Sequence, residues 1–482
     1  RQGEVKMKQT LERMYEDDSG SFHKKYESTT IPYYTSYPTG GQWDPDFGHE
    51  SYIRALGDSA PKGTKVPMAL YIHFPFCPEL CYFCFCVKTI TKNRDRITVY
   101  LEYLHREIDM LLSSLDALGI EPDVRQISLG GGTPTFMSRE EFSGVLAKLS
   151  TFADLSNLEE LSLEVDPRTV SPEDMAFYLE SGISRLSFGI QDFDPAVQEA
   201  INRVQPFELI QPLLADVLGG TSVNFDLIYG LPYSSRETFK ETIRLVRALN
   251  PDRLAVYRYD HTPDIHKNMS AIPADKLPSQ AEMALMYTDA VLELLGNGYE
   301  YIGIDHLAKT DDTLAKAYRE EKIWRNINGY TTYRGYDFSI GLGNSSIGGF
   351  GGYYAQNLKA ENDYYKSIDR NELPVLRGVT LSEDDKIRRF AIFSIVSRHR
   401  LRFEDVEREF DIDFPAYFRD ELATLKELQD DGLVDVTNRS ACLTDIGKLF
   451  AHHVAKAFDR YLVDDSAYVR THAAIAKEKA SA

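Results

Sequence analysis

Short apolar segments alternate with amphipathic segments along the first half of the chain, at intervals of 30 to 50 residues, and this alternation restricts the fold more than any other feature. Apolar strands joined by helices are typical of a parallel sheet that helices cover on the outside. We therefore predict an α/β fold, an incomplete parallel (β/α)6 barrel. The six strands lie within MALYIHF, RQISLGGGTPT, LEELSLEVDP, SRLSFGIQDF, SVNFDLIYGLP and PDRLAVYRYDH.

Helix start and stop signals separate these strands. An amphipathic helix is expected from about Arg94 to Leu118, ending at Gly119, which tolerates a left-handed backbone. Side chains that can cap a helix start precede four further predicted helices: Ser138 with Glu141, Ser171 before Pro172, Asp194 before Pro195, and Ser234 with Glu237. In barrels of this type, functional groups lie at the carboxyl ends of the strands.

The remainder of the chain predicts two additions to this barrel. Residues 324–357 are rich in glycine, aromatic and small polar residues, and we expect a loop-like segment that can approach a ligand closely. The chain then becomes helical and charged, with a winged-helix-like end that could bind DNA or pack as a lid over the barrel. The expected domains are an N-terminal arm at 1–60, the barrel with its extension at 61–365, and a mostly helical C-terminal domain at 366–482.

Charge and hydropathy exclude several classes of partner. The net charge of −20 disfavours nucleic acid and anionic lipid, and makes the lid the better interpretation of the C-terminal domain. No apolar run is long enough to cross a membrane, and the N-terminus lacks the apolar centre of a secretion signal. We expect a cytoplasmic enzyme that acts on a small molecule, without nucleic acid or membrane partners.

Four of the five cysteines lie within ten positions, in HFPFCPELCYFCFCVK. Cys77, Cys81 and Cys84 have C-x3-C-x2-C spacing, which suits three corners of a cubane iron–sulfur cluster and leaves the fourth iron open. A structural zinc site is the alternative, but it would need a fourth ligand, and Cys86 could supply one only through a cramped turn. The open iron favours a cluster that binds a cofactor or substrate.

This spacing, with the aromatic Phe83 before the last cysteine, resembles the signature of radical S-adenosylmethionine (SAM) enzymes. The resemblance implies a [4Fe-4S] cluster whose open iron chelates SAM, and reductive cleavage of SAM to a 5'-deoxyadenosyl radical. From about Thr29 to Leu462 the chain is similar to the oxygen-independent coproporphyrinogen III oxidase family. The shared motifs are YTSYPT, GGGTPT, LEVDPR, GIQDF, DLIYGLP, NPDRLAVY, GYTT, YAQN and DGLVDV.

The resemblance also assigns residues to the first SAM. Glycines at 131 and 132 would let the backbone approach its methionine part, while Arg203 would bind its carboxylate unless it forms an ordinary surface ion pair. Tyr71 and His73 resemble residues that the family places beside the cluster in its active site. The other residues implied at this SAM are Phe83, Thr133, Glu164, Gln191 and Asp226.

The family binds a second SAM next to the first, and here the chain departs from the family pattern. Cys86 matches a residue near that site. The other matching positions are Ile228, Asp260, Ile327, Asn328 and Ile347. Phe85 and Val87 replace glycine and asparagine, Ile327 and Asn328 replace Phe-Gln, Asp260 replaces a small residue, and Tyr33 replaces an arginine of the N-terminal arm. These changes concern the substrate region and leave the cluster and first SAM untouched.

Three functions are compatible with these features. The family activity would be oxidative decarboxylation of coproporphyrinogen III propionates to vinyl groups. A two-SAM methyltransferase or cyclopropanase acting on another substrate is the main alternative, favoured by Phe85 and Tyr33. A haem-binding chaperone is less compatible because Cys86 is retained. Either enzyme would need a low-potential electron donor, a flavodoxin or ferredoxin.

Overall fold

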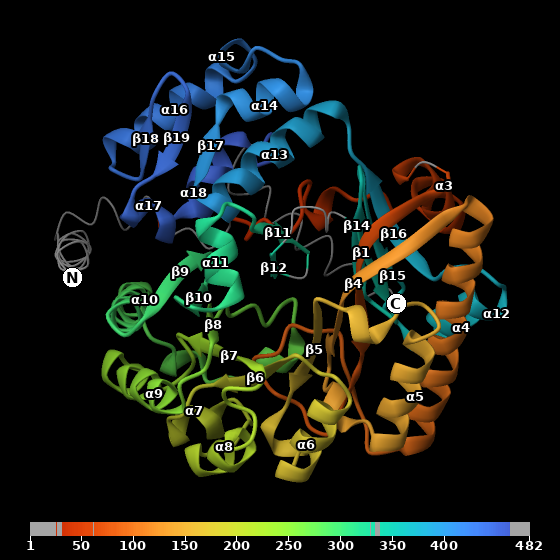
Figure 1. Cartoon of the computed structure of the whole chain (residues 1–482). Coiled ribbons are helices and arrows are strands. Elements are labelled where there is room, and N and C mark those ends of the chain that lie inside the picture. The colour runs from red at the N-terminus through yellow and green to blue at the C-terminus, as the bar shows by residue number, and fades with distance from the viewer. Residues whose placement is uncertain (1–25, 27–30, 61, 328, 333–337, 463–482) are drawn as a thin grey trace.

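The computed structural model describes residues 26, 31–60, 62–327, 329–332 and 338–462. Six parallel strands form its centre in the order in which they occur along the chain, and helices lie outside them (Figure 1). The predicted incomplete (β/α)6 barrel is therefore confirmed. The strands are β1 (Thr64–Phe74), β4 (Ile120–Gly131), β5 (Glu160–Val165), β6 (Arg185–Gln191), β7 (Ser222–Tyr229) and β8 (Arg253–Arg258).

The outer helices begin and end largely where the sequence predicts. Helix α4 (Arg94–Leu118) ends at Gly119 in the left-handed conformation, and α5 (Arg139–Leu149) opens on the capping box of Ser138 and Glu141. The other helices around the barrel are α6 (Pro172–Glu180), α7 (Pro195–Ala200), α8 (Phe207–Leu214), α9 (Arg236–Leu249) and α10 (Gln280–Leu295).

One predicted cap is wrong by one residue. The N-cap of α9 is Ser235, and its capping-box partner is Thr238. Ser234 is buried, and its hydroxyl donates to the carbonyl oxygen of Leu231 at 2.7 Å. Ser234 is therefore occupied by the preceding turn and is not free to cap the helix.

The central sheet continues beyond the barrel on both sides. Strand β13 runs parallel to β1, and three antiparallel strands follow it, while β10 and β9 extend the opposite edge beyond β8. These strands are β13 (Phe338–Leu342), β14 (Ile347–Phe350), β15 (Tyr353–Asn357), β16 (Val375–Thr380), β10 (His306–Lys309) and β9 (Tyr299–Gly303). The sheet does not close into a full ring, because its edge strands β16 and β9 do not pair with each other.

The expectation that 324–357 is loop-like is wrong. This segment contains β13, β14 and β15 together with the hairpin of β11 (Trp324–Asn326) and β12 (Gly329–Thr331). Its glycines serve close strand packing: a Cβ at Gly341 would lie 2.8 Å from the carbonyl oxygen of Ile347, and one at Gly348 would lie 2.6 Å from that of Ser339. Because these two glycines have no side chains, the backbones of adjacent strands can approach each other closely.

A buried carboxyl group ties this extension to the barrel. Glu107 of α4 is 2% exposed and accepts hydrogen bonds from the amide of Gly343 at 2.7 Å, from Asn357 Nδ2 at 2.7 Å and from the Tyr364 hydroxyl at 2.6 Å. Tyr364 belongs to α12 (Glu361–Asp369). Burial raises the pKa of Glu107 to about 7, although these donors oppose the shift.

The C-terminal region is mostly helical, as predicted, and packs as a second hydrophobic core above the barrel (Figure 1). Its three-stranded sheet has the order β17-β19-β18. The elements are α13 (Glu383–Arg398), β17 (Arg400–Arg402), α14 (Phe403–Phe410), α15 (Phe414–Tyr417), α16 (Arg419–Asp430), β18 (Val434–Val436), β19 (Ser440–Leu443), α17 (Asp445–Leu449) and α18 (Ala451–Ala455).

The described part of the N-terminal arm packs against this C-terminal region. The Tyr34 hydroxyl donates to Asp459 at 3.0 Å, and the amide of Arg460 donates to the Tyr37 hydroxyl at 3.2 Å. Both tyrosines are buried, so the described part of the arm packs firmly against the end of the C-terminal region. Helix α3 (His49–Ser59) then leads into β1. None of the described helices combines the length and the apolar character that crossing a membrane requires.

Candidate functional site

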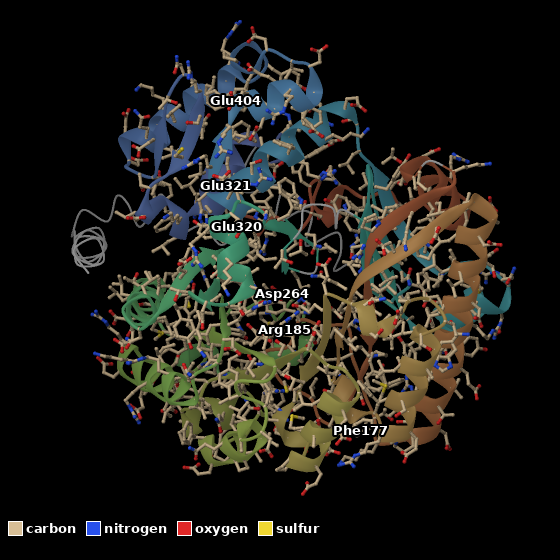
Figure 2. The ribbon with its side chains drawn as sticks, viewed as in Figure 1. Phe177, Arg185, Asp264, Glu320, Glu321 and Glu404 are labelled. Atoms are coloured by element: carbon tan, nitrogen blue, oxygen red, sulfur yellow. The ribbon has the colours of Figure 1, made fainter. Side chains whose placement is uncertain are left out.

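Two adjoining cavities lie within the barrel. The smaller lies at the carboxyl ends of the strands, and the larger extends through the barrel interior as far as Arg185 and Arg253, the first residues of β6 and β8. The smaller has a volume of about 390 Å³ and the larger about 810 Å³. They share eight lining residues, so one continuous space runs from the cysteine loop into the barrel. The shared residues are Phe85, Cys86, Gly131, Glu164, Ser187, Asp226, Tyr257 and Arg258. In Figure 2, the labelled Arg185, which lines the larger cavity, lies toward the middle of the molecule, whereas Phe177 lies on an outer helix.

The three cysteines of the C-x3-C-x2-C loop all line the smaller cavity. The Thr133 hydroxyl lies 3.3 Å from the Cys77 sulfur, and the guanidinium groups of Arg168 and Arg203 lie 3.4 and 3.5 Å from the Cys81 sulfur. A hydrogen bond or cation beside sulfur favours the deprotonated form. At Cys77 the Thr133 hydrogen bond opposes burial, which raises the pKa of this thiol to about 12. The loop therefore presents ligands and neighbours suited to an anionic metal centre.

The donor set fits a cluster better than a single ion. A tetrahedral zinc ion would bring its thiolates to within about 4 Å of one another. Among the residues that the structure describes, no three such side chains are gathered to hold one ion. Cys86 is the fourth cysteine nearby, and its hydrogen bond to Cys84 is the main cause that lowers the pKa of Cys84.

Close packing, and not only the approach of a cofactor, requires glycines in this loop. A Cβ at Gly131, whose φ is +108°, would lie 2.4 Å from the His73 ring, and one at Gly132 would lie 2.6 Å from the backbone of Pro75. The close packing of this loop on the cysteine strand thus requires both glycines even without a ligand. Both also line the smaller cavity, so the expected close approach of a cofactor stays compatible with the structure.

Polar side chains from three successive strands face the junction of the cavities. Glu164 accepts a hydrogen bond from the amide of Gly131 at 3.0 Å, and burial raises its pKa to about 7. Asp226 accepts from Ser187 at 3.1 Å and from Asn224 at 2.9 Å. Its pKa is also raised, again mainly by burial. Gln191 lines the smaller cavity only.

Arg203 does not form an ordinary surface ion pair. Its side chain is 8% exposed and pairs with Asp166 at 3.1 Å, and it also donates to the carbonyl oxygen of Gly189 at 2.8 Å. It is held against Cys81 in the wall of the smaller cavity. The role of Arg203 at the SAM carboxylate stays a prediction.

Tyr71 and His73 line the larger cavity beside Cys86. His73 Nε2 lies 3.0 Å from the carbonyl oxygen of Val87, so Nε2 carries the proton and Nδ1 accepts from the Tyr71 hydroxyl at 3.4 Å. Burial lowers the pKa of His73 to about 4, which keeps the ring neutral near pH 7. These residues form a polar but uncharged wall.

The positions that the resemblance assigns to a second SAM lie on both cavities. Ile327, Ile347 and Asp260 line the larger cavity, whereas Ile228 lines the smaller. Asn328 is outside the described residues. Tyr33, which replaces an arm arginine, also lines the larger cavity, and its ring stacks on His452 of α18. Five of the departures from the family pattern, Tyr33, Phe85, Val87, Asp260 and Ile327, therefore line one cavity.

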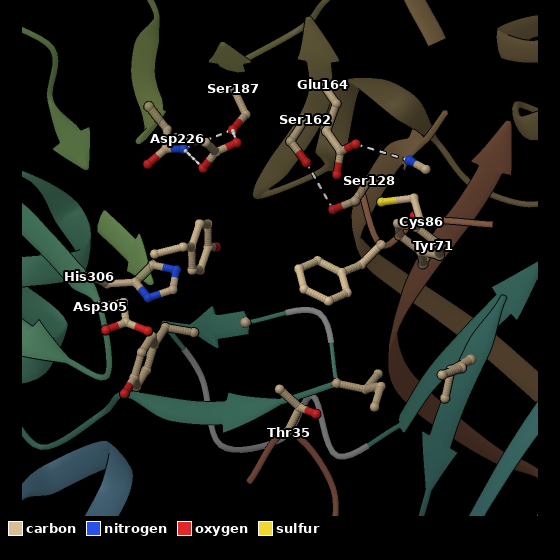
Figure 3. Close-up of a pocket in the computed structure, with 18 of the residues that line it drawn as sticks. Thr35, Tyr71, Cys86, Ser128, Ser162, Glu164, Ser187, Asp226, Asp305 and His306 are labelled. Carbon is tan, nitrogen blue, oxygen red and sulfur yellow. Dashed lines mark hydrogen bonds between the residues drawn. The ribbon is translucent and has the colours of Figure 1, made fainter. Parts of the chain in front are cut away.

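The larger cavity is also lined by polar residues that the sequence analysis did not predict: Ser128, Ser162, Ser187, Asp305 and His306. Figure 3 shows Ser128, Ser162, Glu164, Ser187 and Asp226 along one side, Tyr71 and Cys86 at one end, and Asp305 with His306 at the other. Ser128 and Ser162 are hydrogen bonded at 2.8 Å. Small polar residues in the middle of otherwise apolar strands were the available signal, because such residues need a polar or open surrounding.

The comparisons with known proteins agree with this geometry. The Radical SAM superfamily profile matches residues 71–246, and the HemN C-terminal domain profile matches 381–450. The oxygen-independent coproporphyrinogen III oxidase of Helicobacter pylori is 38% identical over 89% of this chain and 94% of its own length. That of Pseudomonas aeruginosa is 39% identical over 89% and 93%. The structure of coproporphyrinogen III oxidase (HemN) from Escherichia coli has a TM-score of 0.83 and 38% identity, covering 89% of this chain and 98% of that one.

The barrel and its three-cysteine loop thus define a radical SAM enzyme, with a [4Fe-4S] cluster and SAM as cofactors. More narrowly, the chain belongs to the oxygen-independent coproporphyrinogen III oxidase family. The alternative of a methyltransferase or cyclopropanase is not favoured by these relatives.

Proposed function

We propose that this enzyme converts two propionate side chains of coproporphyrinogen III to vinyl groups by oxidative decarboxylation. The observation that carries this proposal is the combination of near full-length identity to oxidases with a larger cavity of about 810 Å³ beside the cysteine loop. Cavities that bind drug-sized small molecules commonly have volumes of roughly 300–1,000 Å³.

The chain's own residues would divide the work between the two cavities. Cys77, Cys81 and Cys84 would hold the cluster, with Arg168 and Arg203 balancing its charge. When bound, the cluster and SAM supply a 5'-deoxyadenosyl radical. That radical would take a hydrogen atom from the propionate β-carbon and become 5'-deoxyadenosine. Loss of carbon dioxide, with transfer of one electron from the substrate radical to a one-electron acceptor, would then leave the vinyl group.

The junction of the cavities would position SAM. Glu164 and Asp226 lie there with raised pKa values, and the amide of Gly131 is fixed by its bond to Glu164. We assign Phe83, Gly132, Thr133, Gln191 and Arg203, all on the smaller cavity, to the first SAM. Tyr71 and His73 would give the reacting region a neutral wall that does not repel a propionate.

A second SAM per chain is a separate proposal. Its support is that Cys86 lines both cavities, while Ile327 and Ile347 line only the larger one. We also expect a low-potential electron donor, a flavodoxin or ferredoxin, because reduction of such clusters needs one.

A second candidate function rests on Phe85. Its side chain is 46% exposed at the cavity junction, packed edge-on against His266 with 4.9 Å between ring centroids. A bulky aromatic ring where the family has glycine narrows the space for a large macrocycle. Methyl or methylene transfer from a second SAM to a smaller unsaturated substrate is therefore the competing proposal.

An anaerobic assay separates the two. The reconstituted enzyme is incubated with SAM, a strong reductant and coproporphyrinogen III, and tetrapyrroles and adenosyl products are measured together by mass spectrometry. We expect vinyl-bearing product with 5'-deoxyadenosine in proportion to turnover. SAM cleavage with an untouched porphyrinogen would reject the decarboxylase and favour group transfer.

A further inference from the structure

Four arginines line the larger cavity, and three of them already have carboxylate partners. Arg185 and Arg253 lie 3.0 and 3.5 Å from Glu160, and Arg253 also lies 2.9 Å from Asp312. Arg258 lies 3.5 Å from Asp260. Such pairs neutralise one another, so these guanidinium groups have little charge left for a ligand.

Arg325 differs from the other three. Its residue is 5% exposed, and its buried Nε and Nη1 atoms have no hydrogen-bond partner. Among the described residues no carboxylate oxygen lies within 4 Å of its guanidinium. The group lies over the ring of Tyr330, with Cζ 4.9 Å from the ring centroid. A buried, unpaired cation is costly, and an incoming anion would relieve that cost.

The hairpin of β11 and β12 holds Arg325 in a fixed place. Arg325 pairs with Tyr330 across the hairpin, and its amide donates to the Ser397 hydroxyl at 2.9 Å. The Tyr330 hydroxyl donates to the carbonyl oxygen of Val396 at 2.8 Å. Both anchors belong to α13, so the C-terminal domain sets the position of this guanidinium in the cavity.

The ionisable groups near Arg325 offset its charge only in part. Burial raises the pKa of Asp305 to about 7 against the attraction of Arg325, so this carboxyl group is partly protonated at neutral pH. Burial lowers the pKa of His306 to about 3 and that of His452 to about 4, which keeps both rings uncharged. Asp305 and His306 lie at the end of the cavity opposite Tyr71 and Cys86 (Figure 3).

We propose that Arg325 is the anchor for a carboxylate of the substrate, a propionate that does not itself react. This proposal rests on the proposed function, because coproporphyrinogen III carries propionates around its rim. A guanidinium fork binds a carboxylate with two parallel hydrogen bonds and thereby fixes its orientation. Anchoring one propionate near His306 would direct another edge of the macrocycle toward Cys86.

The test compares binding of two probes without turnover. The reconstituted holoenzyme with SAM, but without reductant, is titrated anaerobically with coproporphyrinogen III and with its tetramethyl ester. We expect the wild type to prefer the acid by about tenfold or more, as loss of a charge-assisted pair predicts. Arg325→Gln should weaken binding of the acid by a similar factor and leave that of the ester nearly unchanged.

Two further variants control this experiment. Arg325→Lys keeps the charge without the fork and should give intermediate affinity for the acid. Arg370→Gln, an exposed arginine paired with Glu372 on the outer face, should bind both probes like the wild type. Iron content and circular dichroism show whether each variant has folded.

The outcomes are distinguishable. Equal binding of acid and ester by the wild type would overturn the anchor without any variant. An unchanged preference for the acid in Arg325→Gln would overturn the anchor and leave the proposed function intact. If the wild type binds neither probe, the proposed function fails, and the anchor fails with it.

Discussion

The imidazole of His73 occupies the place that any side chain at position 131 would need. A Cβ at Gly131 would lie 2.4 Å from Nδ1 and Cε1 of His73, and the backbone of Gly131 has a φ of +108°. The glycine loop and the strand that leads to the cysteines thus pack closely against each other. The hydrogen bond from the Gly131 amide to Glu164 also connects the loop to β5.

Gly131→Ala should displace His73 and destabilise the protein. The unfavourable φ alone costs about 1–3 kcal/mol, and the clash adds to it. We expect a lower melting temperature of the reconstituted enzyme and loss of turnover. Gly144→Ala is the matched control, because nothing lies within 4 Å of its Cβ and alanine favours a helix. Equal melting temperatures for the two variants would show that the loop tolerates a side chain.

A comparison of Cys84→Ser with Cys86→Ser should show which of these two cysteines is a ligand of the cluster. Cys84→Ser removes one of three thiolates, so we expect loss of most bound iron and of the cluster's electron paramagnetic resonance signal. Cys86→Ser should keep both while losing product formation, because Cys86 lies at the cavity junction. Iron loss of equal size in both variants would make Cys86 a ligand instead.

Phe85→Gly should reveal whether this ring contacts the substrate. An aromatic contact is worth about 0.5–1.5 kcal/mol, so its loss should raise the KM for coproporphyrinogen III by up to about tenfold. Reductive SAM cleavage without substrate should stay at the wild-type rate. Phe85→Leu keeps an apolar side chain and serves as the control. A lower KM in Phe85→Gly would mean that Phe85 obstructs the macrocycle, in support of a different natural substrate.

Glu107→Gln should change how stability depends on pH. The pKa of Glu107 in the folded protein is about 7, above its ordinary value of 4.5. The contribution of this group to the free energy of unfolding is therefore full below about pH 4.5 and is lost as pH rises through 7. The free energy of unfolding of the wild type should therefore fall by roughly 1–3 kcal/mol between pH 5.5 and 8, and that of the variant should not show this fall.

Urea unfolding of the apoprotein at both pH values measures this difference. Tyr364→Phe removes one donor to Glu107 and should raise the pKa further, which shifts the loss to higher pH. A stability difference between wild type and Glu107→Gln that is the same at pH 5.5 and 8 would contradict the assignment.

The barrel was predictable because its signals are local. Gly119 and the pair Ser138–Glu141 act within one helical turn, and each works without knowledge of the rest of the fold. Ser234 fails as a predicted cap only because a neighbouring carbonyl captures its hydroxyl. The cysteine spacing is equally local, since one short loop supplies all three thiols.

The remaining structure depends on contacts between distant parts of the chain. Strand β13 pairs with β1 through partners such as Ser339 and Ala69, and glycine-rich strands carry little strand propensity to reveal them. Arg325 belongs to no motif that we recognised. Its significance appears only when the hairpin, α13 and the barrel mouth are brought together, and when its neighbours prove to leave it unpaired.

The contacts of the N-terminal arm have a consequence for biosynthesis. Tyr34 and Tyr37 are synthesised more than 400 residues before their partners Asp459 and Arg460. Since domains generally fold as units during synthesis, the barrel and its cysteine loop can form before the arm has anything to bind. The cysteine loop could then receive its cluster before the arm and the C-terminal region come together.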